Sequence, residues 1–297
     1  MNMALLRSID RVVAATDLSP ASELAVEQAA LLAKRWGAAL FLLHVFNDGF
    51  WATLKALYQA EQWVGTEPVL AARQRLSQQV RELGERHGLK VSGETRTGRA
   101  ATEIAAFCRE EDAQLLVVGE HGEDWIGDTL VGGTALKVLK RAERPVLLVR
   151  RPVSPEVTHI LVATDFSETS MRAAELAGML FPESHRELVH AYSVAFEGRM
   201  RLAGASSEDI ERYRKDELVR AEQQILQQVR TLRARSPARP LLLHGYPAAA
   251  LIHEAERARA DLIVIGKHGG TVLDERLLGS VTHNVLYGAR CNVLLVP

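Results

Sequence analysis

The stretch ADLIVIGKHGGTVLDERLLGS, residues 260–280, joins a short apolar run to glycines at a defined spacing. LIVI is typical of a buried strand, and Gly266-x2-Gly269-x9-Gly279-Ser280 follows it. A helix that begins after such a loop offers free backbone N–H groups to phosphate oxygens. A lone glycine would indicate only a turn. A near copy, AQLLVVGEHGEDWIGDTLVGG at residues 113–133, repeats the spacing and favours the phosphate hypothesis.

The rest of the chain is repeated in the same order. IDRVVAATDLSPASELAVEQAALLA from Ile9 matches VTHILVATDFSETSMRAAELAGMLF from Val157, and FLLHVF from Phe41 matches ELVHAY from Glu187. RPVLLVR near the end of the first half likewise matches CNVLLVP at the end of the second. Two prolines interrupt the pattern in RRPVSPEVTH, residues 150–159. We therefore predict two tandem domains, residues 1–151 and 157–297.

Short Val/Ile/Leu runs alternate with segments of helical length in each half. Continuously apolar strands are typical of a parallel sheet covered on both faces, so the pattern predicts two doubly wound α/β domains. In this fold ligands bind beyond the carboxyl ends of the strands, where strand order reverses. The rule selects Asp165, His190, His244 and Gly266, with Asp17, His44, Thr97 and Gly119 as their first-half counterparts.

The composition narrows the class of partner. Of 297 residues, 47% are hydrophobic and 25% charged, as in folded globular proteins, and the net charge of −1 argues against nucleic acid. Cys108 and Cys291 lack CxxC spacing, which excludes a cysteine-rich zinc site and suits a reducing compartment. No apolar run approaches the ~20 residues needed for membrane insertion. We expect a cytoplasmic protein that binds small ligands or other proteins.

The glycine spacing, with ILVATDFS (residues 160–167) as first strand, resembles the universal stress protein (UspA-type) family over nearly the whole chain. The resemblance implies a five-stranded parallel sheet in each domain, in the order 3-2-1-4-5, with helices on both faces. It also implies ATP binding and pairing of the last strands PVLLV and NVLLV, which would make an internal pseudo-dimer. A further homodimer is compatible with it.

The resemblance also implies a set of ligand-binding residues. Asp165 would meet the ribose or adenine, the Ala191 backbone would pair with the adenine edge, and the glycine loop would surround the phosphates, with or without Mg²⁺. The predicted set is Thr164, Asp165, Ala191, Gly266, His268, Gly269, Gly279, Ser280, Val281 and Thr282. A weaker first-domain site would comprise Asp17, Val45, Gly119, Gly122, Gly132 and Gly133.

The first half departs from the pattern at two points. Gly133 stands where the second half has Ser280, and four acids occur between Gly119 and Thr134 without a lysine or arginine: Glu120, Glu123, Asp124 and Asp128. Like charges disfavour a triphosphate, by about 1 kcal/mol or less each when solvated. We therefore expect ATP in the second domain and weak or no ATP binding in the first.

Other chemistries find little support in the residues. The chain has no P-loop, Rossmann glycine fingerprint, HExxH or Gly-x-Ser-x-Gly motif. His190, His244 and His268 with Asp165 are a conceivable metal set, but we predict neither a metal site nor a catalytic residue. The leading hypothesis is a nucleotide-dependent regulator with an unknown protein partner. The alternatives are a slow ATPase or autophosphorylating switch using Asp274 and Glu275, and a binder of another small or apolar ligand.

Overall fold

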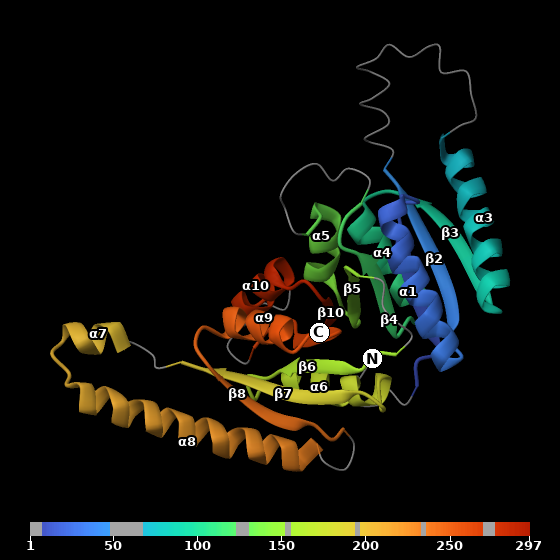
Figure 1. Cartoon of the computed structure of the whole chain (residues 1–297). Coiled ribbons are helices and arrows are strands. Elements are labelled where there is room, and N and C mark those ends of the chain that lie inside the picture. The colour runs from blue at the N-terminus through green and yellow to red at the C-terminus, as the bar shows by residue number, and fades with distance from the viewer. Residues whose placement is uncertain are drawn as a thin grey trace, which may run out of the picture. The chain divides into compact units, whose positions relative to one another are not determined.

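The protein is described from a computed structural model that covers residues 8–47, 68–122, 131–151, 156–193, 197–232, 236–269 and 277–297. The chain divides into two compact units between residues 155 and 156. In both units strands and helices alternate (Figure 1).

The first unit contains a five-stranded parallel sheet in the order β3-β2-β1-β4-β5. Helices α1 and α3 pack together on one face, and α4 packs against α5 on the other (Figure 1). The elements are β1 (Arg11–Thr16), α1 (Pro20–Trp36), β2 (Ala39–Phe46), α3 (Pro68–His87), β3 (Val91–Thr97), α4 (Ala100–Glu110), β4 (Leu115–Gly119), α5 (Gly133–Arg141) and β5 (Val146–Val149).

The second unit repeats this order as β8-β7-β6-β9-β10. Helices α6 and α8 cover one face, and α9 and α10 the other (Figure 1). The elements are β6 (His159–Ala163), α6 (Glu168–Leu180), β7 (His185–Tyr192), α7 (Glu197–Leu202), α8 (Ser207–Leu232), β8 (Arg239–His244), α9 (Pro247–Arg257), β9 (Leu262–Gly266), α10 (Ser280–Gly288) and β10 (Asn292–Val296). The predicted fold class and strand order are confirmed.

Local sequence explains where the first helix of each unit begins. Ser19 caps α1, its hydroxyl accepting from the Ser22 N–H, and Pro20 supplies a preset φ at the first helical position. Gly37 ends α1 in the left-handed conformation at φ 68°. Ser167 caps α6 in the same way, accepting from the Ser170 N–H. The repeated cap fixes the turn after the first strand, which lies at the carboxyl end of the sheet.

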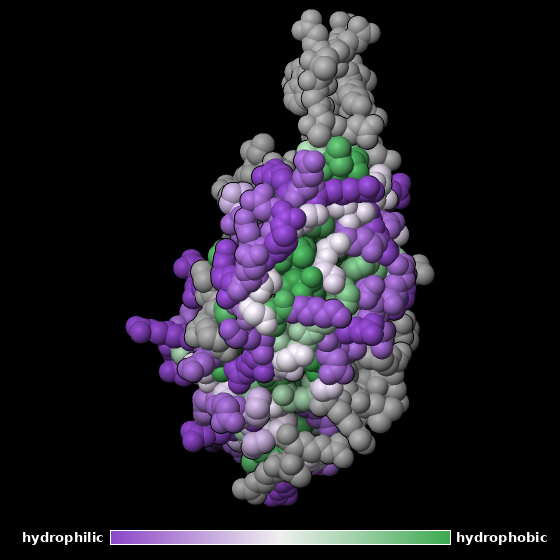
Figure 2. Space-filling model, turned by 90° about the vertical axis from the view of Figure 1, so that its right-hand side faces the viewer, coloured by the Kyte–Doolittle hydropathy of each residue, from purple (hydrophilic) through white to green (hydrophobic). Residues whose placement is uncertain are grey.

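The helices are amphipathic, so their apolar sides build the cores. Strand β9 is buried along its whole length and β4 at all but its last residue, as the continuous apolar runs predicted. Figure 2 shows one face of the molecule, covered mainly by hydrophilic residues with hydrophobic ones gathered in a narrow strip between them. No helix in the described ranges is long and apolar enough to cross a membrane.

Candidate functional site: the crevice at the carboxyl ends of the second sheet

The turn after β6 presents the Asp165 carboxylate. Phe166 adopts a left-handed conformation, φ 67°, and its N–H donates to the Thr164 hydroxyl at 3.0 Å. Asp165 Oδ1 accepts from the Ser167 N–H at 3.1 Å and from the Ser167 hydroxyl at 2.5 Å. Asp17 makes the same two contacts with Ser19 in the first unit. The turn therefore orients the aspartate through one oxygen.

The second glycine of the motif lies directly against this aspartate. A Cβ atom added to Gly269 would overlap Asp165 Oδ2, and one added to Gly122 would lie 2.5 Å from Asp17 Oδ2. Real Cβ atoms essentially never approach so closely, so any larger residue here would have to displace the Asp165 carboxylate. The contact brings the loops after β6 and β9 together at the carboxyl end of the sheet.

Helix α10 begins at the same end of the sheet. Its cap residue, Gly279, donates its N–H to the Lys267 carbonyl at 2.9 Å, and Lys267 in turn donates to the Val296 carbonyl at 2.7 Å. The first intrahelical bond runs from His283 to the Gly279 carbonyl at 2.8 Å. The N–H groups of the first turn have no acceptor within a helix and form the positive end of its dipole. With Ser280 exposed beside them, this end of α10 suits an anion.

Thr282 attaches the first turn of α10 to the end of β9. Its buried hydroxyl donates to the Gly266 carbonyl at 2.8 Å. The equivalent residue in the first unit is Ala135, which has no hydroxyl. His268 adds a second attachment, since its Nδ1 lies 2.8 Å from the Leu277 carbonyl. These two predicted ligand residues therefore hold the crevice in shape.

Thr164 and His190 lie beside the turn after β6. The Thr164 hydroxyl is buried, 3.0 Å from the Ser170 hydroxyl and 2.7 Å from Gln228 Oε1. His190 Nδ1 lies 2.9 Å from the Thr164 carbonyl, and the His190 ring packs on Phe166 with centroids 4.2 Å apart. Both side chains support the turn that carries Asp165.

A cavity of about 320 Å³ opens beside the end of β7. His190 and Tyr192, the neighbours of Ala191, line it from the strand, and Glu217, Arg220, Ala221, Gln223 and Gln224 line it from α8. Sequence reasoning missed the α8 residues, because their polar pattern equally describes a solvated helix face. The volume is in the range of small-molecule pockets, about 300–1,000 Å³.

The crevice of the first unit has the same backbone frame with different side chains. Gly132 donates to the Glu120 carbonyl at 2.8 Å, and Glu120 donates to the Val149 carbonyl at 3.0 Å, as at the start of α10. A Cβ at Gly133 would meet open space. Of the four acids that the sequence analysis counted against a triphosphate, Glu120 has a compensating cation, because Arg150 Nε donates to Glu120 Oε1 at 2.7 Å. The other three acids of the segment lie outside the described residues.

The alternative metal set is not brought together. The described histidines of that set take separate partners, and His244 packs on the Tyr192 ring with centroids 5.3 Å apart. Within the described ranges, the group with metal-ligand spacing lies at the other end of the strands. Asp274 and Glu275, the candidates for a slow ATPase, fall outside the described residues.

Comparison with known proteins decides the family. The profile described as universal stress protein family matches residues 8–150 and again 156–297. The chain belongs to the universal stress protein family. A universal stress protein of Mycolicibacterium smegmatis is 28% identical over 96% of both chains. One from Methanocaldococcus jannaschii is 28% identical over 48% of this chain and 82% of its own.

Solved structures agree with the tandem arrangement. The crystal structure of a universal stress protein from Archaeoglobus fulgidus aligns with a TM-score of 0.64 and 19% identity, covering 96% of this chain and 97% of that one. At this identity the likeness shows the fold alone. Both halves of the chain are thus universal stress protein domains, and the crevices described above are their candidate ligand sites.

Proposed function

We propose that this universal stress protein binds ATP in the crevice of its second unit and acts as a nucleotide-dependent regulator with very slow or no hydrolysis. The proposal rests on three features that lie together at the carboxyl end of the second sheet. They are the exposed start of α10 at Gly279 and Ser280, the Asp165 carboxylate against Gly269, and the cavity beside Ala191.

Each feature suits a different part of the nucleotide. N–H groups of the first turn of α10, with the Ser280 hydroxyl, would hold phosphate oxygens. The Asp165 carboxylate would accept hydrogen bonds from the ribose hydroxyls. The cavity lined by His190 and Tyr192 offers the adenine an aromatic wall at the edge where the Ala191 backbone lies. When bound, ATP would stabilise one conformation of this loop set for an unknown protein partner; Mg²⁺ is optional to this role.

The first unit is proposed to bind ATP weakly or not at all. Its frame is equivalent, but Gly133 gives the start of α5 no hydroxyl, and the segment that follows Gly122 carries Glu123, Asp124 and Asp128. Pairing of the two last strands in an internal pseudo-dimer, which the family resemblance implies, stays a prediction.

The test is a nucleotide titration of the full chain with matched variants. Ser280→Ala with Gly279→Val should lower ATP affinity at least tenfold. A tenfold loss corresponds to ~1.4 kcal/mol, and one hydrogen bond to a charged group contributes about 1.5–3 kcal/mol. A Cβ at Gly279 would make only ordinary contacts, the nearest at 3.5 Å to His268 Cα, so the fold should tolerate the change.

The control uses the other unit. Gly133→Ser places a hydroxyl in open space at the equivalent helix start, so it should fold normally and change overall ATP affinity little. Gly132→Val is a poorer control, because its Cβ would lie 3.1 Å from the Glu120 carbonyl. Unchanged ATP affinity in the folded second-unit variant, or two equal independent sites per chain, would contradict the proposal.

A further inference from the structure

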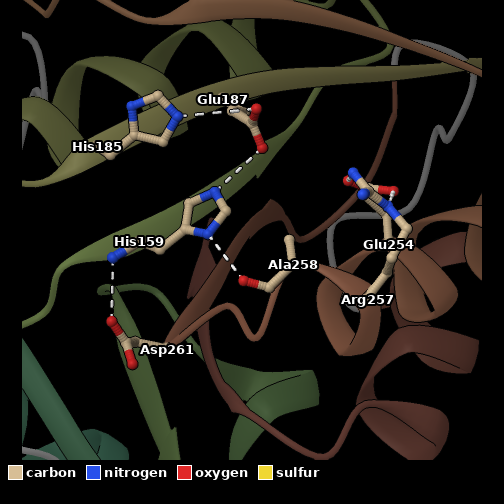
Figure 3. A network of polar contacts seen from close by, with 7 residues as sticks. All are labelled: His159, His185, Glu187, Glu254, Arg257, Ala258 and Asp261. Carbon is tan, nitrogen blue, oxygen red and sulfur yellow. Dashed lines mark hydrogen bonds and ion pairs between the residues drawn. The ribbon is translucent and has the colours of Figure 1, made fainter.

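A second polar cluster lies at the amino ends of the strands of the second unit, opposite the crevice. His159 begins β6, and His185 begins β7 directly beside it in the parallel register. Glu187 follows two residues later, so it points to the same face of the sheet as His185. Figure 3 shows the three side chains turned toward one another. The length of β6 separates them from the crevice by roughly 16 Å.

The hydrogen bonds of His159 indicate which ring nitrogen carries its proton. Nδ1 lies 3.2 Å from the Ala258 carbonyl oxygen, which can only accept, so Nδ1 carries a hydrogen (Figure 3). Nε2 lies 3.0 Å from Glu187 Oε2. In a neutral ring Nε2 presents a lone pair to a carboxylate, and two acceptors at this distance repel each other. A cation must therefore lie between them, either a proton or a metal ion.

The third side chain favours the metal ion. His185 Nε2 lies 3.7 Å from Glu187 Oε1, and the ligand atoms of all three residues lie within 4.8 Å of one another. Around a tetrahedral zinc ion with bonds of about 2.0–2.2 Å, neighbouring ligand atoms are about 3.3–3.6 Å apart. Each histidine is already near this distance from the carboxylate, His159 from Oε2 at 3.0 Å and His185 from Oε1 at 3.7 Å. His185 has 42% of its side chain exposed, so small rotations of His185 and of the carboxylate can bring one Glu187 oxygen and both ring nitrogens around a single ion.

The surroundings resemble the outer shell of a metal site. A ligating histidine commonly donates its other N–H to a carbonyl, as His159 does to Ala258. Asp261 Oδ2 accepts from the His159 N–H at 3.0 Å and from the Thr158 N–H and hydroxyl, both at 2.8 Å. This fixes the backbone that carries His159. Figure 3 shows three carboxylates, those of Glu187, Glu254 and Asp261, and one guanidinium, that of Arg257. The Arg257 guanidinium donates to the two carboxylate oxygens of Glu254 at 2.8 and 2.5 Å.

The first unit provides an internal comparison. At the positions of His159, His185 and Glu187 it has Arg11, Ala39 and Phe41, placed by the same strand register. Arg11 donates to the Glu111 carbonyl at 2.8 Å, the counterpart of the bond from His159 to Ala258. The frame is therefore common to both units, whereas the three ligand side chains belong to the second unit alone. A structural role satisfied by arginine and apolar residues does not require two histidines and a glutamate.

We propose that His159, His185 and Glu187 bind one divalent transition-metal ion of the zinc class, with water completing the coordination. Two imidazoles and a carboxylate are a donor set that zinc, cobalt and nickel accept, and magnesium and calcium, which prefer oxygen ligands, do not. This inference does not depend on nucleotide binding in the crevice. It differs from the sequence prediction, which named no metal site.

The test is a zinc titration of the full chain, with any histidine tag removed and metal stripped by a chelator. We expect one zinc ion per chain by calorimetry, competed by a chromophoric chelator. His185→Gln and Glu187→Gln should each lower zinc affinity at least about 100-fold, since loss of an outer-shell partner alone costs about 10–100-fold. Both positions are partly exposed, so both variants should fold. Cobalt substitution should give the visible absorption of a low-coordinate nitrogen and oxygen site.

A matched control comes from the first unit, where His87 Nε2 contacts Glu27 Oε1 at 2.8 Å without a second histidine in the pair. His87→Gln should leave zinc affinity unchanged, and so should Ser280→Ala in the crevice. Absence of saturable zinc binding would overturn the proposal and leave His159 and Glu187 as a hydrogen-bonded pair. Zinc affinity that survives in both ligand variants, with circular dichroism showing them folded, would overturn it equally.

Discussion

The attachment of α10 to β9 through Thr282 can be tested by a substitution that removes one hydrogen bond and changes the side-chain volume very little. Thr282→Val keeps the branched shape but deletes the hydroxyl that donates to the Gly266 carbonyl at 2.8 Å. Thr282 is only 4% exposed, so little water can replace the donor. A buried carbonyl left without its donor costs about 1–3 kcal/mol. At an m-value of about 2 kcal/mol/M, a loss of about 2 kcal/mol moves the urea midpoint by about 1 M.

The assay can report the two units separately. All four tryptophans, at positions 36, 51, 63 and 125, belong to the first half of the sequence. Tryptophan fluorescence therefore follows the first unit, whereas hydrogen exchange of peptides from β9 and α10 follows the second. We expect Thr282→Val to lower exchange protection and the urea midpoint in the second unit and to leave the tryptophan transition in place.

Thr282→Ser is the matched control, because it keeps the hydroxyl and removes only the methyl group. It should retain most of the protection that valine loses. The start of α10 should also become less rigid in the valine variant, so ATP affinity should fall in the same direction as stability. Equal midpoints for valine and wild-type protein would refute the reasoning, since they would show that the Gly266 carbonyl gains nothing from this hydroxyl.

Three further predictions concern packing, thiol reactivity and pH. Gly178→Ala should lower the free energy of unfolding by about 1–3 kcal/mol in urea titrations, because its Cβ would overlap the buried Ser236 side chain, which donates to the Ala174 carbonyl. Cys108 should resist a disulfide reagent until urea unfolds the first unit, because burial raises the pKa of its thiol to about 12; rapid labelling of the native chain would contradict this. Burial opposes ionisation of Asp261, but hydrogen bonds from His159 and Thr158 lower its pKa overall. Its stabilisation is therefore present above the ordinary aspartate pKa of about 3.9 and lost as pH falls through the lower folded value, so Asp261→Asn should destabilise at pH 7 and converge with wild type in acid.

The fold could be predicted because its signals are local and repeated. The apolar runs, the Ser19 and Ser167 caps and the two glycine loops each fix a stretch of backbone, and duplication shows which of them belong together. The reason for the second glycine of each motif was not predictable. It depends on a contact between Gly269 and Asp165, which are distant in sequence and meet only when β6 and β9 pair.

The parts that escaped sequence reasoning are those made by side chains from several elements. Glu217 and Arg220 line the cavity beside β7, but on α8 they follow an ordinary polar helix pattern. His159 and His185 start different strands, and only the parallel register places them side by side. The rule that directs attention to the carboxyl ends of strands also directs it away from this cluster.

At both ends of its sheet, the second unit keeps the backbone frame of the first unit but carries different side chains. At the carboxyl end, the bonds that fix α5 and α10 are equivalent, but Ser280 and Thr282 replace Gly133 and Ala135. At the amino end, Gln114 Oε1 accepts from the Arg11 N–H at 2.8 Å as Asp261 accepts from the His159 N–H. Substitutions that leave such a frame intact cost the fold little, so side chains at both ends are free to acquire ligand-binding roles. A ligand at either end would order the same strands β6 and β7, so we expect zinc binding to strengthen ATP binding, and by linkage ATP to strengthen zinc binding by the same factor. Titrating each ligand in the presence of the other measures this factor, and a factor of one would contradict the expected coupling between the two ends of the sheet.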